Sequence, residues 1–172
     1  MASDLRAFTL HRVWAGMVKL GWKPWEFRNC RPLSCIGQRV AIHAGLREGD
    51  VEAFRALAHR LRAGLSDGGD YALEQIMAVA PAGHIVCTAV VGEPVWMPDR
   101  PEEDALLWDE STEREDARRH LPPGYEGTRY AIPLRDVRRL TAPVRATGHI
   151  NLGWRVPDDV AALVREREVA CG

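Results

Sequence analysis

Three charged residues lie close together near the start of the chain: Lys23, Glu26 and Arg28. Side chains alternate between the two faces of an extended strand, so Glu26 and Arg28 share one face, and Lys23 joins them if Pro24 bends the chain. With that bend, the three side chains converge on one pocket. Arg28 would then offer a fork of donors to a phosphate or a base edge, and Lys23 a point charge. The alternative is a structural ion pair that needs no ligand.

Other side chains that could contact a ligand are a histidine and two tryptophans. His43 comes at the end of an expected strand, where it could donate to a base or a phosphate or titrate near neutral pH. Trp25 and Trp154 could stack on a base, a contact worth roughly 1 to 3 kcal/mol in single-strand binders. Each also has an ordinary structural use, because histidines form hydrogen bonds inside folds and tryptophans pack in cores.

Charge is distributed in blocks, although the formal net charge is -1. Residues 1–45, which include Arg31, hold seven Lys or Arg against two acids, and residues 129–145 hold five arginines against one aspartate. Between them, residues 93–116 hold ten acids against two arginines. If the two basic segments meet in the fold, they form a basic face that could hold phosphates, with an affinity that falls as salt rises. Solvated edges of strands and helices would show the same pattern.

The composition is that of a globular protein, with 172 residues, 46% of them hydrophobic and 27% charged. No apolar run approaches the roughly 20 residues that cross a bilayer, and the first residues lack a signal-peptide pattern, so we expect a cytoplasmic protein without membrane contact. Four irregularly spaced cysteines favour reduced thiols, and Cys30 with Cys35 lacks the second ligand pair of a zinc site. We therefore expect no metal. No phosphate-binding glycine motif is present, so we also expect no cofactor, and the sequence has no Ser-His-Asp order.

Short elements of both kinds alternate along the chain. Strands are predicted over residues 6–10, 25–28, 38–43, 83–91, 128–133, 137–140 and 148–156. Helices are predicted over residues 11–20, 51–65, 71–79, about 110–120 and 157–169, with Asp50 as the N-cap of the second. This pattern predicts an α+β fold, built on a small curled sheet or barrel with flanking helices.

The domain organisation follows from the same pattern. Residues 1–172 are interpreted as one domain, with an acidic insertion at about 93–127 that is marked by five prolines. This insertion could form a lid over the basic face or dock on a basic partner.

Three segments in the first quarter of the chain, taken in order, resemble the ASCH family. They are FTLHRVW (8–14), GWKPWEFRN (21–29) and GQRVAIHAG (37–45). Farther on, GHIV (83–86) resembles the strand that follows the variable helices of that family, and GHINLGW (148–154) resembles its closing segment. The order and rough spacing agree across the chain.

The resemblance implies a PUA-like fold, which is a small mixed β-barrel with helices at its openings, and a protein that binds RNA or acts on modified nucleosides. We therefore predict a module that binds RNA or single-stranded DNA through a basic pocket for a nucleobase or a phosphate. The residues predicted to form this site are Lys23, Glu26, Arg28, Arg31, His43, Trp25 and Trp154.

The alternative function is that of a small hydrolase. Some small ASCH-type proteins resemble amidohydrolases that deacylate a modified cytidine with a lysine, a neighbouring threonine and a carboxylate. Lys23 matches that lysine, whereas Glu26 stands at the threonine position and could act as general acid or base with Lys23. Both residues would then be catalytic, and the substrate would be a modified nucleoside such as an N-acylated cytidine, or another nucleoside or nucleic acid. The sequence leaves binding or hydrolysis, and the oligomeric state, open.

Overall fold

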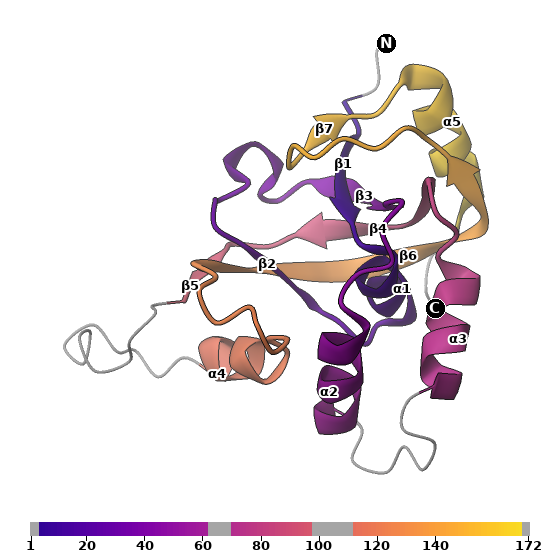
Figure 1. The fold of residues 1–172 in the computed structure, drawn as a ribbon. Helices are drawn as coiled ribbons and strands as arrows, with labels where there is room; N and C mark the ends of the chain where they lie inside the picture. The colour runs from indigo at the N-terminus through magenta and orange to yellow at the C-terminus, as the bar shows by residue number, and fades with distance from the viewer. Residues whose placement is uncertain (1–3, 62–69, 98–111, 170–172) are drawn as a thin grey trace.

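The computed structural model describes residues 4–61, 70–97 and 112–169, which form a sheet with helices packed on both of its faces (Figure 1). The strands are β1 (Arg6–Leu10), β2 (Trp25–Arg28), β3 (Arg39–Ala44), β4 (His84–Val91), β5 (Val95–Trp96), β6 (Tyr130–Arg145), β7 (Trp154–Arg155) and β8 (Glu168–Val169). The helices are α1 (Arg12–Leu20), α2 (Val51–Leu61), α3 (Asp70–Val79), α4 (Thr112–Arg119) and α5 (Asp158–Arg167), with a short 3-10 turn at Leu33–Cys35.

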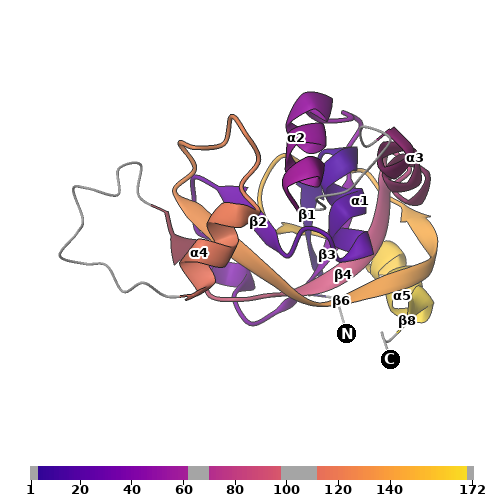
Figure 2. The same cartoon turned by 90° about the horizontal axis from the view of Figure 1, so that it is seen from below.

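The long strand β6 organises the sheet. The strand order is β2-β6-β4-β3-β1-β7, and β5 and β8 also pair with β6. Strand β1 runs parallel to β3, whereas the other pairs are antiparallel. Because β6 curves along its length, the sheet curls into a half-barrel (Figure 2). This curled mixed sheet with flanking helices confirms the predicted α+β fold class.

Apolar side chains fill the space on both faces of the sheet. Helices α1, α2 and α3 cover one face, where the larger core includes the fully buried Phe8 and Phe54. Helix α5 covers the opposite face, where Ile85 of β4 and Val164 belong to a smaller core (Figure 2). The sheet is therefore held in place from both sides by apolar burial.

The residues that predicted helix ends act as expected. Oδ1 of Asp50 accepts a hydrogen bond from the backbone N–H of Ala53 at 2.9 Å, which caps α2. Gly21 takes a left-handed conformation with φ of 77° and ends α1.

Helix α1 also packs closely on α3, because a Cβ atom on Gly16 would lie 2.5 Å from Cγ2 of Ile76.

The two strands predicted over residues 128–133 and 137–140 are in fact parts of the single strand β6. The strand passes through the intervening segment because Asp136 takes a left-handed conformation with φ of 44°, and the register with β4 shifts there. A bulge of this kind bends a strand without ending it. The sequence prediction treated the bulge as a strand end.

Two predictions near the C-terminus were also too long. The strand predicted over 148–156 is reduced to Trp154–Arg155, and the helix predicted over 157–169 ends at Arg167. The last two residues of that prediction form β8, which pairs with Leu140 and its neighbour in β6. Pairing with the backbone of β6 favours the strand over another helical turn. The cations Arg39 and Arg138, which attract Glu168, favour it too.

Some predictions fall partly outside the described residues. The end of the helix predicted over 51–65 lies in residues 62–69, and most of the acidic run lies in residues 98–111. The helix predicted near 110–120 is present as α4. Within the described ranges, no helix is long and apolar enough to cross a membrane.

Candidate functional site

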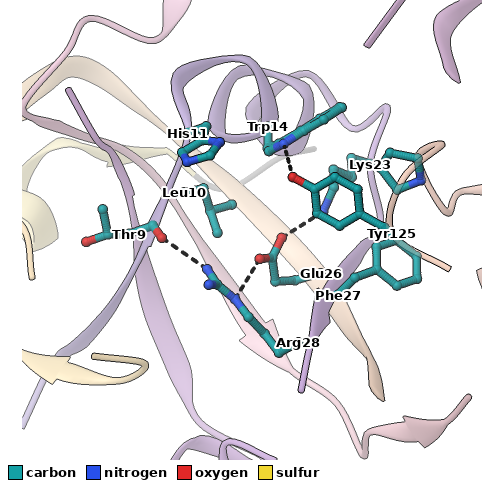
Figure 3. A pocket seen from close by; sticks show the side chains of 10 residues that line it. Thr9, Leu10, His11, Trp14, Lys23, Glu26, Phe27, Arg28 and Tyr125 are labelled. Carbon is teal, nitrogen blue, oxygen red and sulfur yellow. Dashed lines mark hydrogen bonds and ion pairs between the residues drawn. The ribbon is translucent and has the colours of Figure 1, made fainter. Parts of the chain in front are cut away.

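The structure brings Lys23, Glu26 and Arg28 together at one side of a small cavity (Figure 3). Nζ of Lys23 donates to Oε2 of Glu26 at 2.7 Å and to the backbone carbonyl of Trp25 at 2.5 Å. On the other side, Nε of Arg28 lies 2.9 Å from Oε1 of Glu26 in an ion pair. The buried carboxylate therefore lies between two cations.

The turn between α1 and β2 places Lys23 beside the other two residues. After Gly21 ends the helix, the backbone N–H of Lys23 donates to the carbonyl of Met17 at 3.3 Å. The carbonyl of Pro24 then accepts from the N–H of Leu134 in β6 at 2.7 Å, which fixes the start of β2. The chain thus bends at Pro24, and the Lys23 side chain reaches the face that carries Glu26.

Burial governs the charge states in this cluster. Desolvation lowers the pKa of Lys23 and outweighs the attraction of Glu26. For Glu26, burial by itself raises the pKa, but the charges of Lys23 and Arg28 and their contacts outweigh it and hold the pKa below its ordinary value. Glu26 is therefore ionised at neutral pH, and with Lys23 protonated the cluster carries a net positive charge.

The cavity, of about 100 Å³, is walled by residues from three other parts of the chain (Figure 3). Thr9 and His11 come from β1 and the turn after it, Trp14 from α1, and Pro122 and Tyr125 from the segment after α4. Nε1 of Trp14 donates to the hydroxyl oxygen of Tyr125 at 3.3 Å, and the two rings meet edge to face at 6.2 Å. Part of the predicted insertion thus closes one side of the cavity.

Arg28 is the cation of the cluster that a ligand can reach. Its side chain is 32% exposed, whereas Lys23 is 2% exposed. Nη2 of Arg28 donates to the backbone carbonyl of Thr9 at 3.1 Å, so the guanidinium plane is held by β1 on one side and by Glu26 on the other. A fork fixed in this way can present its remaining donors with little further loss of side-chain freedom.

Thr9 and Tyr125 line the cavity but were not among the predicted site residues. Thr9 lies inside the first family-like motif, so that motif was the signal that could have indicated it. Tyr125 lies in the proline-rich segment that was interpreted as an insertion, and nothing in its local sequence places it beside Trp14.

The structure places the other predicted site residues elsewhere. Trp25 lies in an apolar cluster behind β2, with Nε1 donating to Asp116 at 2.8 Å. Arg31 forms an exposed ion pair with Glu93. These two residues do not line the cavity beside Lys23: Trp25 packs in that apolar cluster, and Arg31 lies beyond the end of β2.

His43 and Trp154 also lie outside that cavity. His43 lines a second, larger groove, and Trp154, which is 7% exposed, packs edge to face on the His43 ring at 5.9 Å. Nε1 of Trp154 donates to Oγ1 of Thr9 at 3.0 Å. Thr9 lines both the cavity and the groove, so the two hollows are neighbours.

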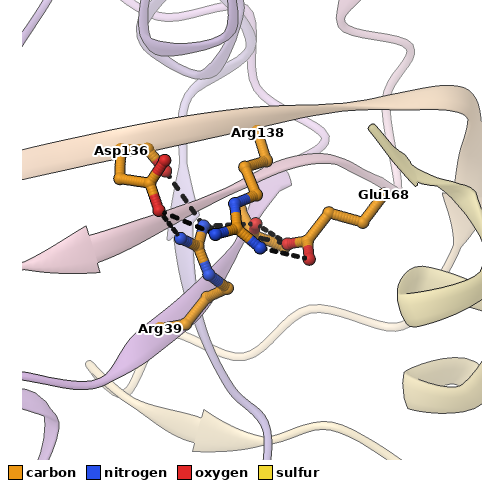
Figure 4. Close-up of polar contacts among 5 residues, drawn as sticks. Arg39, Asp136, Arg138 and Glu168 are labelled. Atoms are coloured by element: carbon orange, nitrogen blue, oxygen red, sulfur yellow. Dashed lines mark hydrogen bonds and ion pairs between the residues drawn. The ribbon is translucent and has the colours of Figure 1, made fainter. Parts of the chain in front are cut away.

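Acidic partners neutralise much of the predicted basic face. Arg39 and Arg138 both contact Asp136 and Glu168, which ties β3, β6 and β8 together (Figure 4). Arg39 also donates to Oγ1 of Thr88 at 3.0 Å. This network has equal numbers of cations and anions, so it stabilises the sheet edge and adds little to phosphate attraction.

No model of a known protein family and no curated protein matches the sequence. Two of the solved structures that are similar to this chain are of one ASCH protein. The crystal structure of ASCH from Zymomonas mobilis is 17% identical over 97% of this chain and 97% of its own, with a TM-score of 0.47. A mutant of the same protein is 17% identical over 97% of this chain and 100% of its own, with a TM-score of 0.49.

Both structures carry the family name that the N-terminal motifs predict. At this identity, no residue role is transferred from them to this chain.

Proposed function

We propose that the cavity beside Lys23, Glu26 and Arg28 binds a nucleobase, and that the protein is a binding module for RNA or single-stranded DNA. The observation that carries the proposal is a charged cluster with two cations and one anion, buried beside a cavity that has aromatic walls. Buried ion pairs give little net stability to a fold, so a cluster of this kind beside a cavity is a candidate site.

The chemistry of the cavity suits a base better than a phosphate. The carboxylate of Glu26 lies 2.9 Å from Nε of Arg28 and would repel a phosphate that approached the same guanidinium. A base edge carries donors and acceptors without net charge, so it can pair with the open donors of Arg28. The ring of Tyr125 offers a flat wall for the face of the base.

Arg28→Ala, compared with Arg31→Ala, tests the proposal. Both changes remove one arginine, but Arg31 lies outside the cavity in an exposed pair with Glu93. We expect Arg28→Ala to weaken the binding of short RNA and DNA single strands by about tenfold or more, and Arg31→Ala to weaken it far less. Fluorescence anisotropy with labelled oligonucleotides measures both. Absent binding, or equal effects of the two changes, would contradict the proposal.

A second candidate is an amidohydrolase that acts on a modified nucleoside. It is favoured by burial, which lowers the pKa of Lys23 in the direction that a base or nucleophile needs. The two acceptors of Nζ, however, favour the protonated ammonium, and this is why binding comes first. The test is turnover of N4-acylated cytidines by the wild type and its loss in Lys23→Met. No product at high protein concentration would remove this candidate.

A further inference from the structure

A second hollow lies next to the proposed base site. It is a groove of about 690 Å³ between the loop after β6, the start of α5 and the ends of β3 and β4. Its wall includes a cation, three imidazoles and two exposed apolar side chains: Arg145, His43, His84, His149, Leu46 and Ile150. In the first cavity, Lys23 is buried. In this groove, the basic side chains other than His43 lie at or near the surface.

His43, which lines this groove, has one unsatisfied polar atom. The residue is 2% exposed, and its Nε2 lies 3.1 Å from the carbonyl of Ala146, a contact in which Nε2 must carry the proton. Nδ1 is then an acceptor, and it has no hydrogen-bond partner among the described residues. Desolvation lowers the pKa of His43, which keeps the ring neutral and Nδ1 unprotonated. Buried acceptors are normally paired, so this atom indicates a missing donor.

The loop packs against this ring at Gly148. A Cβ atom on Gly148 would lie 2.4 Å from Nδ1 of His43 and 3.0 Å from Oγ1 of Thr9. A glycine is therefore required where the loop meets both residues. His43 and Gly148 both belong to the wall of the groove.

Arg145 gives the groove wall a cation that can attract an anion. Arg145 is exposed and forms no ion pair with any residue that the structure describes, unlike Arg135 and Arg138 of the same strand. Pro157 and Val160 line the groove at the first turn of α5, where the carboxylates of Asp158 and Asp159 already offset the positive end of the helix. Asp159 lines the same wall and opposes an anion.

Thr9 connects the two hollows. Its carbonyl accepts from Nη2 of Arg28 on the cavity side, and its hydroxyl oxygen accepts from Nε1 of Trp154 on the groove side. A ligand whose base contacts Arg28 would have to extend past Thr9 to reach the groove. In a nucleic acid, the part that extends from the base is the sugar and the phosphodiester.

We infer that one single strand occupies both hollows, with a base in the cavity and the adjoining sugar-phosphate in the groove near Arg145. The inference rests on the proposed function and deepens it, because it adds a second subsite, for the backbone of the strand, to the base site. The cavity binds the base, and the groove contacts the phosphate.

The test compares ligands with and without a phosphodiester. Wild type, Arg145→Ala, Asp159→Asn and Arg119→Ala are titrated with a nucleoside and with a short single-stranded oligonucleotide at several salt concentrations. Arg119 is the matched control, because it is exposed on α4 and lines neither hollow. All the changed side chains are exposed, so each variant should fold.

We expect Arg145→Ala to weaken oligonucleotide binding about fivefold or more, and to leave nucleoside binding unchanged. It should also lower the slope of log K against log salt by about 0.7, the loss of one single-strand phosphate contact. Asp159→Asn should strengthen oligonucleotide binding, and Arg119→Ala should change it little.

Unchanged oligonucleotide affinity and salt slope in Arg145→Ala would overturn the groove assignment. If the nucleoside still bound in that case, the base site would stand. If neither ligand bound the wild type, the proposed function itself would fail.

Discussion

Nζ of Lys23 lies 2.7 Å from Oε2 of Glu26, and the two side chains are 2% and 8% exposed. At this depth, neither charge is solvated by bulk water, so each depends on the other and on Arg28. The pair has the same i,i+3 spacing as the surface pair of Glu52 and Arg55, at 2.6 Å. The surface pair is exposed, whereas the buried pair is shielded from water and shares its carboxylate with Arg28, so the two allow a comparison.

Glu26→Gln should destabilise the protein by about 3 kcal/mol, because it leaves the ammonium of Lys23 buried without its counter-charge. Glu52→Gln, which breaks the exposed pair, should cost about 0.5 kcal/mol or less. Urea denaturation of the two variants measures both free energies of unfolding. Similar values for the two variants would show that the buried pair is not electrostatically important.

The same pair predicts a pH dependence. The folded-state pKa of Glu26 lies below its ordinary value, because Lys23 and Arg28 outweigh the effect of burial. Its stabilising contribution is therefore complete above the ordinary glutamate pKa of about 4.3, and it is lost as the pH falls through the lower folded-state pKa.

The measurement is the free energy of unfolding of wild type and Glu26→Gln across a pH series. The difference between them should be constant near neutral pH and shrink as the pH falls below about 4. A difference that persisted at lower pH would mean that Glu26 is not the titrating group.

Cysteine burial predicts an order of reactivity. Cys30 is exposed, whereas Cys35 and Cys87 are buried, and burial raises the pKa of Cys87 to about 12. In a Cys171→Ser background, a thiol reagent should modify Cys30 in the folded protein and the two buried thiols after unfolding. Cys171 is replaced because it lies outside the described residues. Rapid modification of a second thiol before unfolding would contradict the burial of Cys35 or Cys87.

Local signals in the sequence account for the parts of the fold that were predicted correctly. The cap at Asp50 and the apolar strand β4 depend on neighbouring residues, so they are visible in the sequence alone. The approach of Lys23 to Glu26 was also foreseeable, because Pro24 limits the local backbone. In each case the decisive interaction spans a few positions of the chain.

The features that were missed depend on contacts between distant segments. Tyr125 reaches the cavity through a contact with Trp14, 111 positions away in the chain. Glu168 leaves α5 for a strand because cations on β3 and β6 attract it. The position of His43, outside the cavity beside Lys23, depends on how β1 and β3 pair. Pattern and spacing do not contain these contacts.

Tyr125 has two separable roles, which two substitutions distinguish. Tyr125→Phe removes the acceptor for Nε1 of Trp14, which is 4% exposed, and this should cost about 1 kcal/mol of stability while the aromatic wall remains. Tyr125→Ala removes the wall too, and it should weaken base binding by about 1 to 3 kcal/mol if the ring stacks on the base. Tyr130→Phe is a control, because Tyr130 does not line the cavity.

Denaturation and oligonucleotide titration of the same variants separate these effects. Because the phenylalanine ring keeps its face, Tyr125→Phe should lose stability and retain affinity, whereas Tyr125→Ala should lose both. Full affinity in Tyr125→Ala would show that the ring closes the cavity without contacting the ligand. Arg28 and the rest of the charged cluster would then have to account for base recognition without an aromatic partner.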